Sequence, residues 1–349
     1  MNTYFALGLM SGTSLDGLDI CYAKFSLKDL IWNFEILEAQ TIPYSSNWKE
    51  KLEEAINLSA TDLLELNSEY GFYLGDQIAE FIVLKKIKEI NLISSHGHTV
   101  HHQPEKKFTC QIGDGRAIKI KNNFPVVYDF RSQDVLLGGN GAPLVPIGDE
   151  ILFSKYEACL NLGGFSNISF KEKGKRMAFD ISPLNIVLNH FSEKLGKKFD
   201  DKGEIAKAGI VNQSILQHLN NLEFYKNTTP KSLGFEFVKN EIFPLLKNDS
   251  AENILATFSE HAADKIAEIL NKFKINNVLL TGGGTYNDFL LEKIRSKTDC
   301  KIIIPENKII DFKEALIFGF MGVLKLRGEN NVLCSATGSL HDHSSGILI

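Results

Sequence analysis

The chain has 349 residues and a formal net charge of −5, and hydrophobic residues make up 44 % of it. This length exceeds that of an ordinary domain and predicts two lobes, each with a sizeable core. No basic run stands out, no apolar run reaches membrane-spanning length, and the five cysteines are dispersed, so we expect a cytoplasmic protein that binds neither nucleic acid nor membrane.

The first half of the chain reads as a meander of strands followed by helices and short buried strands. Apolar alternation predicts strands at 4–9, 18–25 and 32–38. Helical periodicity follows at about 47–57 and 61–89, and short buried strands are predicted at 92–95 and 126–128.

The turn between the first two strands, GLMSGTSLDGLD (8–19), is unusually rich in small and polar residues. Small residues let backbone N–H groups converge on an anion, hydroxyls add donors, and a carboxylate holds Mg²⁺ through water. We therefore expect a phosphate-binding loop in which Thr13 and Ser14 contact phosphate or sugar and Asp16 organises Mg²⁺. Ser14 has the alternative of bonding its own turn. Asp19 already lies in the return strand, where structural hydrogen bonding is the alternative.

The second half repeats the pattern of the first. Strands are predicted at 158–162, 166–170, 176–180 and 278–280, and helices at about 184–195, 211–221, 251–273, 286–297 and 312–327. Gly163 and Gly164 form the first turn of this second meander. A third glycine segment, Gly282-Gly283-Gly284, stands at a strand-to-helix junction, which suits a close backbone approach to a nucleotide.

This repeat predicts an α/β chain with a duplicated actin-like (ribonuclease H-like) two-lobe fold and ATP in the inter-lobe cleft. The first lobe is expected to comprise 1–130 plus the C-terminal region from about 312 to 349, and the second lobe 131–311. The residues expected to bind the nucleotide are those of the three glycine-containing loops: Gly12, Thr13, Ser14, Leu15, Asp16, Gly17, Leu18, Asp19, Gly163, Gly164, Gly282, Gly283 and Gly284.

Motifs along the whole chain resemble those of the anhydro-N-acetylmuramic acid kinases of bacterial cell-wall recycling. The stretches that carry the resemblance are GLMSGTSLDGLD (8–19), SSHGHTVHHQP (94–104), QIGDG (111–115), DFRSQDVLLGGNGAPLVP (129–146), NLGGFSN (161–167), PKSLGFE (230–236), TGGGTYN (281–287) and SATGS (335–339). The resemblance implies an Mg²⁺-dependent homodimer. Its members use ATP and water to open the 1,6-anhydro ring and phosphorylate O6, which gives N-acetylmuramate 6-phosphate.

The resemblance also implies that Asp180 is the catalytic base that takes a proton from the attacking water. The alternative for this strand-end residue is to cap the helix that follows. The usual family pattern is F-D-T-G-P-G-N, whereas this chain has Ile181, Ser182 and Leu184 in place of the Thr and both glycines. These changes leave the sugar contacts open, and Phe235 replaces an Arg that the family usually carries.

Further residues are expected at the sugar. Arg131 follows a strand and suits the lactyl carboxylate, with a bridge to Asp129 or Asp134 as its alternative. Four nearby histidines prompt a metal hypothesis, but Gly97 among them predicts a tight turn, so His96 and His98 are expected to line the sugar pocket instead. The substrate set is Thr13, His96, His98, Arg131, Asn185 and Glu314. For Glu314, an acid in the first turn of a helix, the alternative is to complement the helix dipole.

Two other functions remain open at this point. One is an actin-like kinase for another sugar, whose specificity the altered residues at 181–184 reflect. The other is a non-catalytic, nucleotide-dependent switch. A panel of sugars assayed with ATP separates these hypotheses.

Overall fold

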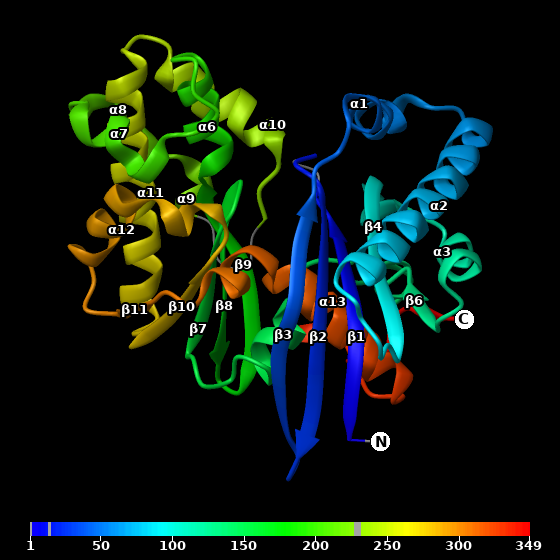
Figure 1. The fold of residues 1–349 in the computed structure, drawn as a ribbon. Coiled ribbons are helices and arrows are strands. Elements are labelled where there is room, and N and C mark those ends of the chain that lie inside the picture. The colour runs from blue at the N-terminus through cyan, green and yellow to red at the C-terminus, as the bar shows by residue number, and fades with distance from the viewer. Residues whose placement is uncertain (1, 13–14, 227–231) are drawn as a thin grey trace. The chain divides into compact units, whose positions relative to one another are not determined.

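A computed structural model describes residues 2–12, 15–226 and 232–349 of the chain (Figure 1). The chain folds into two compact units. The first unit comprises Met1–Phe153 and Phe312–Ile349, and the second comprises Ser154–Asp311.

The sheet of the first unit is mixed, with strand order β12-β6-β4-β1-β2-β3 and β5 paired to β4. Its first three strands form an antiparallel meander, and β4 and β6 run parallel to β1. The strands are β1 (Thr3–Ser11), β2 (Leu18–Lys28), β3 (Ile31–Ile42), β4 (Leu92–Gln103), β5 (Phe108–Ile112), β6 (Val126–Tyr128) and β12 (Ile347–Leu348).

The helices of the first unit include one that carries the chain back from the second unit, α13. Its residues 315–319 pack against β1 so closely that a Cβ on Gly8 would lie 1.9 Å from the carbonyl oxygen of Ala315. The α-helices are α1 (Ser46–Glu54), α2 (Ala60–Leu84), α3 (Gly115–Asn122), α4 (Ser132–Leu136), α5 (Pro146–Ile151), α13 (Asn307–Leu326) and α14 (Cys334–Thr337), with short 3-10 turns η1 (Ala55–Asn57) and η2 (Pro104–Lys106).

The sheet of the second unit has the order β11-β10-β7-β8-β9. Its strands are β7 (Ala158–Leu162), β8 (Phe165–Glu172), β9 (Lys175–Pro183), β10 (Asn277–Thr281) and β11 (Lys301–Ile303). The helical elements are α6 (Asn185–Glu193), η3 (Asp201–Gly203), α7 (Glu204–Ala208), α8 (Gln213–Asn220), α9 (Glu223–Lys226), α10 (Phe235–Phe237), η4 (Val238–Ile242), η5 (Phe243–Leu246), α11 (Ala251–Lys272), η6 (Gly283–Tyr286) and α12 (Asp288–Arg295).

The two sheets share one topology. In each unit three antiparallel strands come first, and the fourth strand of the shared plan (β4 or β10) then pairs parallel to the first (β1 or β7). The fifth strand of the plan, β6 or β11, pairs parallel to the fourth. The prediction of an α/β fold with a duplicated actin-like plan is therefore confirmed.

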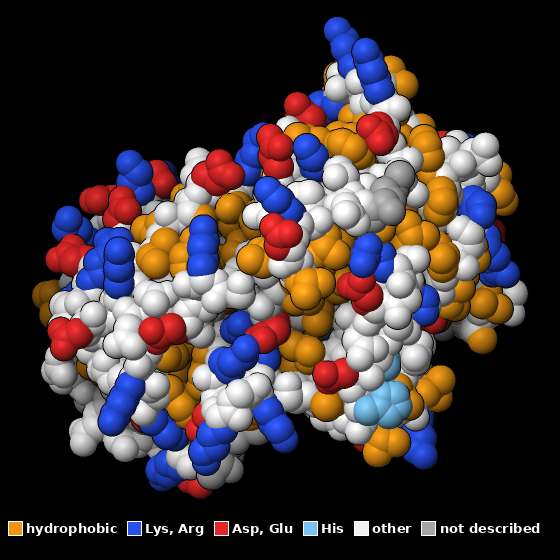
Figure 2. Space-filling model, turned by 90° about the horizontal axis from the view of Figure 1, so that it is seen from below, with side chains coloured by type: hydrophobic (Ala, Val, Ile, Leu, Met, Phe, Trp, Pro, Cys, Tyr) orange, Lys and Arg blue, Asp and Glu red, His pale blue; other side chains and the backbone are white. Residues whose placement is uncertain are grey.

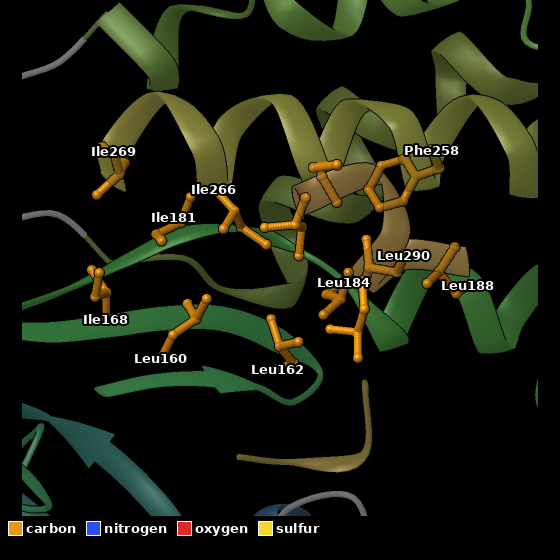
Figure 3. Packing of buried hydrophobic residues seen from close by; sticks show 14 of the residues in the cluster. Leu160, Leu162, Ile168, Ile181, Leu184, Leu188, Phe258, Ile266, Ile269 and Leu290 are labelled. Carbon is orange, nitrogen blue, oxygen red and sulfur yellow. The ribbon is translucent and has the colours of Figure 1, made fainter. Parts of the chain in front are cut away.

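Large aliphatic and aromatic side chains fill the core of the second unit. Leu160, Leu162 and Ile168 from the β7–β8 hairpin face Phe258 and Ile266 of the long helix α11 (Figure 3). Burial of such side chains contributes about 1.5–3 kcal/mol each. This packing fixes the inner face of the sheet and leaves the turn of the hairpin at its edge.

The boundary between the units differs from the expected one. Residues 131–153 belong to the first unit rather than the second. Their contacts explain this assignment: Thr337 donates a hydrogen bond to buried Asp134, and a Cβ on Gly148 would lie 2.4 Å from Ile317 of α13. The strand β4 is also longer than expected, because Gly97, with φ of 75°, is accommodated within it and the strand continues to Gln103.

Charged side chains of both signs are interspersed with apolar ones on the face of the molecule drawn in Figure 2. Within the described residues, no helix has the length and apolar character needed to cross a membrane.

Candidate active site

The first glycine hairpin connects β1 to β2, where Ser11 pairs with Leu18. Thr13 and Ser14 lie outside the described residues. Leu15 adopts a left-handed φ of 56°, and its N–H donates to the Gly12 carbonyl over 3.3 Å. A Cβ on Gly17 would lie 2.6 Å from the Ile42 carbonyl oxygen, so glycine is required for the loop to lie against β3. Leu18 is buried, and its side chain therefore serves the core.

The two carboxylates of this hairpin occupy different settings. Asp19 pairs with Thr41 across β2 and β3 and accepts a hydrogen bond of 2.6 Å from its hydroxyl, which agrees with a structural role. Asp16 is exposed. The described residues contain no cluster of three or more His, Cys, Asp or Glu that could hold a metal. One exposed carboxylate suits Mg²⁺ that arrives with a nucleotide, because Mg²⁺ keeps several waters and is bound by few protein groups.

His96 and Arg131 contact each other within the first unit. The Arg131 Nε donates to His96 Nε2 over 2.9 Å, and its Nη1 donates to the Gly141 carbonyl over 2.5 Å. Burial, together with the neighbouring guanidinium, holds the pKa of His96 well below its usual range, so this imidazole is neutral and accepts through Nε2. Burial also lowers the pKa of Arg131 to about 10. The guanidinium keeps further N–H groups for an oxyanion.

Glu314 lies in α13, in the electrostatic neighbourhood of Arg131. Its side chain is only partly exposed. This burial raises the pKa of its carboxyl, whereas the positive charges of Arg131 and Lys313 act to lower it. The adjacent Lys313 forms a buried ion pair with Asp149 over 2.7 Å. The structure thus brings three of the residues expected at the sugar, His96, Arg131 and Glu314, into one charged region.

His98 has a different set of contacts within the first unit. Its Nδ1 lies 2.9 Å from the hydroxyl of Ser11 at the end of β1, and the Tyr44 hydroxyl donates to that same serine over 2.7 Å. Burial lowers the pKa of His98 to about 4. His98 is therefore a neutral side chain beside the first glycine hairpin.

The two glycine segments of the second unit come together. A Cβ on Gly282, whose φ is 83°, would lie 2.4 Å from the Asn161 side-chain oxygen, and one on Gly284 would lie 2.8 Å from the Leu162 Cβ. A Cβ on Gly164, in contrast, would meet only Ile186, at 4.0 Å. The β7–β8 turn and the start of η6 are therefore neighbours, and space beside Gly164 remains open.

Asn185 completes this arrangement. Its side-chain amide donates to the Leu162 carbonyl over 3.0 Å, and its backbone N–H donates to the Gly163 carbonyl over 3.2 Å. The backbone N–H of Leu184 bonds to the Gly164 carbonyl over 2.8 Å. The start of α6 thereby fixes the β7–β8 turn, and Asn185, which was expected at the sugar, contacts this turn.

Asp180 lies near the end of β9, opposite Asn167 of β8. One carboxylate oxygen, Oδ2, accepts a hydrogen bond of 2.8 Å from the backbone N–H of Leu233. Burial raises the pKa of Asp180 to about 6, while that hydrogen bond lowers it. A carboxylate with a pKa near neutrality is suited to general base catalysis.

The three residues between 181 and 184 that depart from the family pattern are buried. Ile181 and Leu184 belong to the core of the second unit, where Figure 3 shows Leu184 packed near Leu162 and Leu290. Ser182 is fully buried and its hydroxyl lies 2.9 Å from that of Ser166. Bulk at these positions therefore fills the core and does not project beside Asp180. Phe235, at the start of α10, is half exposed and packs edge-on to Phe243.

Sequence reasoning did not identify Tyr44, Tyr70 or the N–H of Leu233 as part of the site region. Tyr70 lies within the helix predicted at about 61–89, where only a polar group at a core position could have drawn attention to it. A backbone donor such as that of Leu233 leaves no signal in side-chain chemistry.

The chain matches the model of a known family over residues 4–349, and the description of that family is anhydro-N-acetylmuramic acid kinase. Proteins named anhydro-N-acetylmuramic acid kinase from Francisella tularensis subsp. novicida (strain U112) and from Bacillus thuringiensis (strain Al Hakam) are each 32 % identical to it. The matches cover 96 % and 97 % of this chain, respectively, and 96 % of each relative.

Among solved structures, component A of the (R)-2-hydroxyglutaryl-CoA dehydratase of Acidaminococcus fermentans is 13 % identical and aligns with a TM-score of 0.47, covering 90 % of this chain and 95 % of that one. The extent of the sequence match decides the assignment: the chain belongs to the anhydro-N-acetylmuramic acid kinase family.

Proposed function

We propose that this protein is an ATP-dependent kinase that opens the 1,6-anhydro ring of anhydro-N-acetylmuramic acid and phosphorylates O6 to give N-acetylmuramate 6-phosphate. Membership of the family supports the reaction class. The observation that carries the proposal within this chain is the setting of Asp180: one oxygen is held by Leu233 and the pKa is raised to about 6.

In this reaction water attacks the anomeric carbon C1, and the bond between C1 and O6 breaks. O6 takes the γ-phosphoryl group of ATP, the bond from the γ-phosphorus to the β,γ-bridging oxygen breaks and ADP leaves, and the proton of the water goes to Asp180. Oδ2 accepts the Leu233 N–H, and we assign the proton to the other oxygen, Oδ1. A placed base of this kind contributes about 10²–10⁴-fold to the rate.

The backbone at Gly164 and the neighbouring Gly282–Gly284 segment supports a role in binding the ATP phosphates, since a Cβ at Gly164 would enter open space. We assign Asp16, with Gly12 and Gly17 of the same loop, to phosphate and Mg²⁺ organisation. Mg²⁺ neutralises charge on the phosphates when bound. Arg131, held by His96, is assigned to the carboxylate of the sugar, with Glu314 nearby.

The remaining expectations rest on the resemblance alone. We propose that the protein acts in the cytoplasm as a homodimer. Light scattering coupled to size-exclusion chromatography checks the assembly: a mass near twice 39.0 kDa supports it, and a mass near 39.0 kDa contradicts it.

The experiment that tests the proposed function is an assay of the purified protein with ATP, Mg²⁺ and a panel of sugars that includes 1,6-anhydro-N-acetylmuramic acid. The proposal expects ADP formation that depends on the anhydro sugar and a product whose mass has increased by one water and one phosphoryl group. Turnover of a different sugar favours the kinase of other specificity. ATP hydrolysis that is independent of every sugar favours the switch.

A further inference from the structure

Four buried polar groups form a continuous chain in the first unit. The hydroxyls of Tyr70 and Tyr44 are 2.6 Å apart, Tyr44 donates to Ser11 over 2.7 Å, and Ser11 lies 2.9 Å from His98 Nδ1. Each of the four residues is exposed by 5 % or less. This series runs from Tyr70 in α2 to His98 in β4 and passes through Ser11 at the end of β1, directly before the first glycine turn.

The directions of these hydrogen bonds are assigned by giving each hydroxyl hydrogen one acceptor, starting from the donation of Tyr44 to Ser11. Each hydroxyl carries one hydrogen. The Tyr44 hydroxyl donates its only hydrogen to Ser11. The hydrogen between the two tyrosines therefore comes from Tyr70, which donates to Tyr44. Ser11 accepts from Tyr44 and directs its own hydrogen to His98 Nδ1, which serves as the acceptor. A neutral imidazole has one N–H, so the hydrogen of His98 is on Nε2.

At the other end of this series of hydrogen bonds, the Nε2–H group of His98 can act as a donor. Among the residues that the structure describes, His98 Nε2 has no hydrogen-bond acceptor, although its ring is packed edge-on to Tyr70 in a buried site. A purely structural core at this place needs no hydroxyl at residue 44, since Trp48 and Tyr73 already pack around Tyr70 with their rings. A buried network of satisfied hydrogen bonds rigidifies its surroundings and holds its groups in one arrangement.

We infer that Ser11 and Tyr44 are positioning residues that fix His98 as its Nε2–H tautomer, so that it donates a hydrogen bond to an acceptor oxygen of the bound sugar. This inference rests on the proposed function for the nature of the ligand. The tautomer itself is independent of any ligand. Tyr70 donates the first hydrogen bond of the series and so sets the direction of those that follow.

The tautomer is tested directly by two-bond ¹H–¹⁵N correlation spectra of protein labelled with ¹⁵N-histidine at pH 7. The expected spectrum of His98 is that of a neutral ring protonated on Nε2. Ser11→Ala removes the hydrogen that Nδ1 accepts and should shift His98 toward a mixture of tautomers. An Nδ1–H tautomer in the unaltered protein, or a spectrum that Ser11→Ala leaves unchanged, overturns the inference.

The role at the sugar is tested with Tyr44→Phe and its matched control Tyr73→Phe. Both remove one hydroxyl from the same aromatic cluster, but the described structure includes only Tyr44 in the chain of hydrogen bonds. Tyr44→Phe should raise the KM for the sugar about five- to tenfold, the value of one hydrogen bond, with the KM for ATP unchanged. Equal sugar KM values for the two variants contradict the role.

These outcomes are separable from those of the proposed function. If the unaltered protein does not turn over the anhydro sugar, the proposed function fails. The spectra of His98 still decide whether Ser11 fixes the tautomer, because they need no substrate.

Discussion

The two units share a strand order but present different chemistry at their first hairpins. In the first unit the β1–β2 turn and the adjacent β4 offer side chains: Asp16, His98 and the chain that begins at Tyr70. In the second unit the β7–β8 turn exposes backbone groups, because the space beside Gly164 is open. Gly282 packs closely against the strand that leads into this turn.

The same strand order therefore carries two kinds of first hairpin, one lined by polar side chains and one that exposes backbone. A turn built of glycine can present its peptide groups to a ligand, whereas a turn flanked by hydroxyls and histidine can contact a ligand through directed donors. Asp180 adds to the second unit the one carboxylate that we assign to proton transfer. Variants in each unit test whether the two hairpins differ in this way. The largest effect on activity is expected for a variant of Asp180.

Asp180→Asn should lower kcat by about 10²–10⁴-fold, because the amide does not accept the proton of the attacking water. The affinities for ATP and the sugar, measured by calorimetry, should stay within a few fold. Thermal unfolding serves as the control for folding. Turnover equal to that of the unaltered protein removes Asp180 from its assigned role.

The buried and the exposed ion pairs of the first unit should contribute differently to the free energy of unfolding. Asp149→Ala leaves Lys313 in a buried site without this partner and is expected to lower the free energy of unfolding by about 3–5 kcal/mol. Lys51→Ala removes an exposed ion pair with Glu69 and should cost less than about 1 kcal/mol. Denaturant titration measures both, and equal losses would show that burial does not govern the contribution of these pairs.

Backbone recognition in the second unit is tested at Gly164. Gly164→Ala should leave the unfolding midpoint unchanged, since the added Cβ meets only Ile186, at 4.0 Å. It should raise the KM for ATP by about tenfold or more through misplacement of the phosphates.

The matched variant Gly282→Ala should instead lower stability, because its Cβ would lie 2.4 Å from Asn161 at a left-handed φ. Unchanged ATP kinetics in a stable Gly164→Ala protein would contradict phosphate binding at this turn.

The smallest effect is expected at Leu233. The acid limb of kcat against pH should lie near 6 in the unaltered protein, with activity lost as pH falls and Asp180 is protonated. Leu233→Pro removes the N–H that stabilises the charged carboxylate, so the limb should move upward by about one pH unit. Leu233→Ala keeps the N–H and should leave the limb in place. A shift of equal size in both variants would assign the effect to the side chain.

The sequence predicted the regular elements well because both hairpin meanders and the long helices have strong periodicity. The strands at 126–128 and 158–162 have the expected bounds, and α11 ends within one residue of its expected end. The first boundary between units was wrong, since contacts such as Gly148 against α13 join segments that are far apart in sequence.

For the site, glycine spacing identified loops that prove to be neighbours in the second unit, namely Gly163–Gly164 and Gly282–Gly284. The sequence did not predict the directions in which these side chains point. Leu184 was expected to alter sugar contacts but fills the core, and the sequence alone did not link Ser11 to Tyr44, because that contact joins residues 33 positions apart.

Asp180 is central to the proposed reaction, in which we assign it to activate water toward the sugar and not toward the phosphate. The most direct test is a single turnover with ATP and the anhydro sugar in H₂¹⁸O, with the products identified by mass at once and unlabelled product kept in H₂¹⁸O as the control for exchange at C1. We predict one ¹⁸O in the sugar phosphate and none in inorganic phosphate. Label in released phosphate, with the anhydro ring intact, would contradict this role.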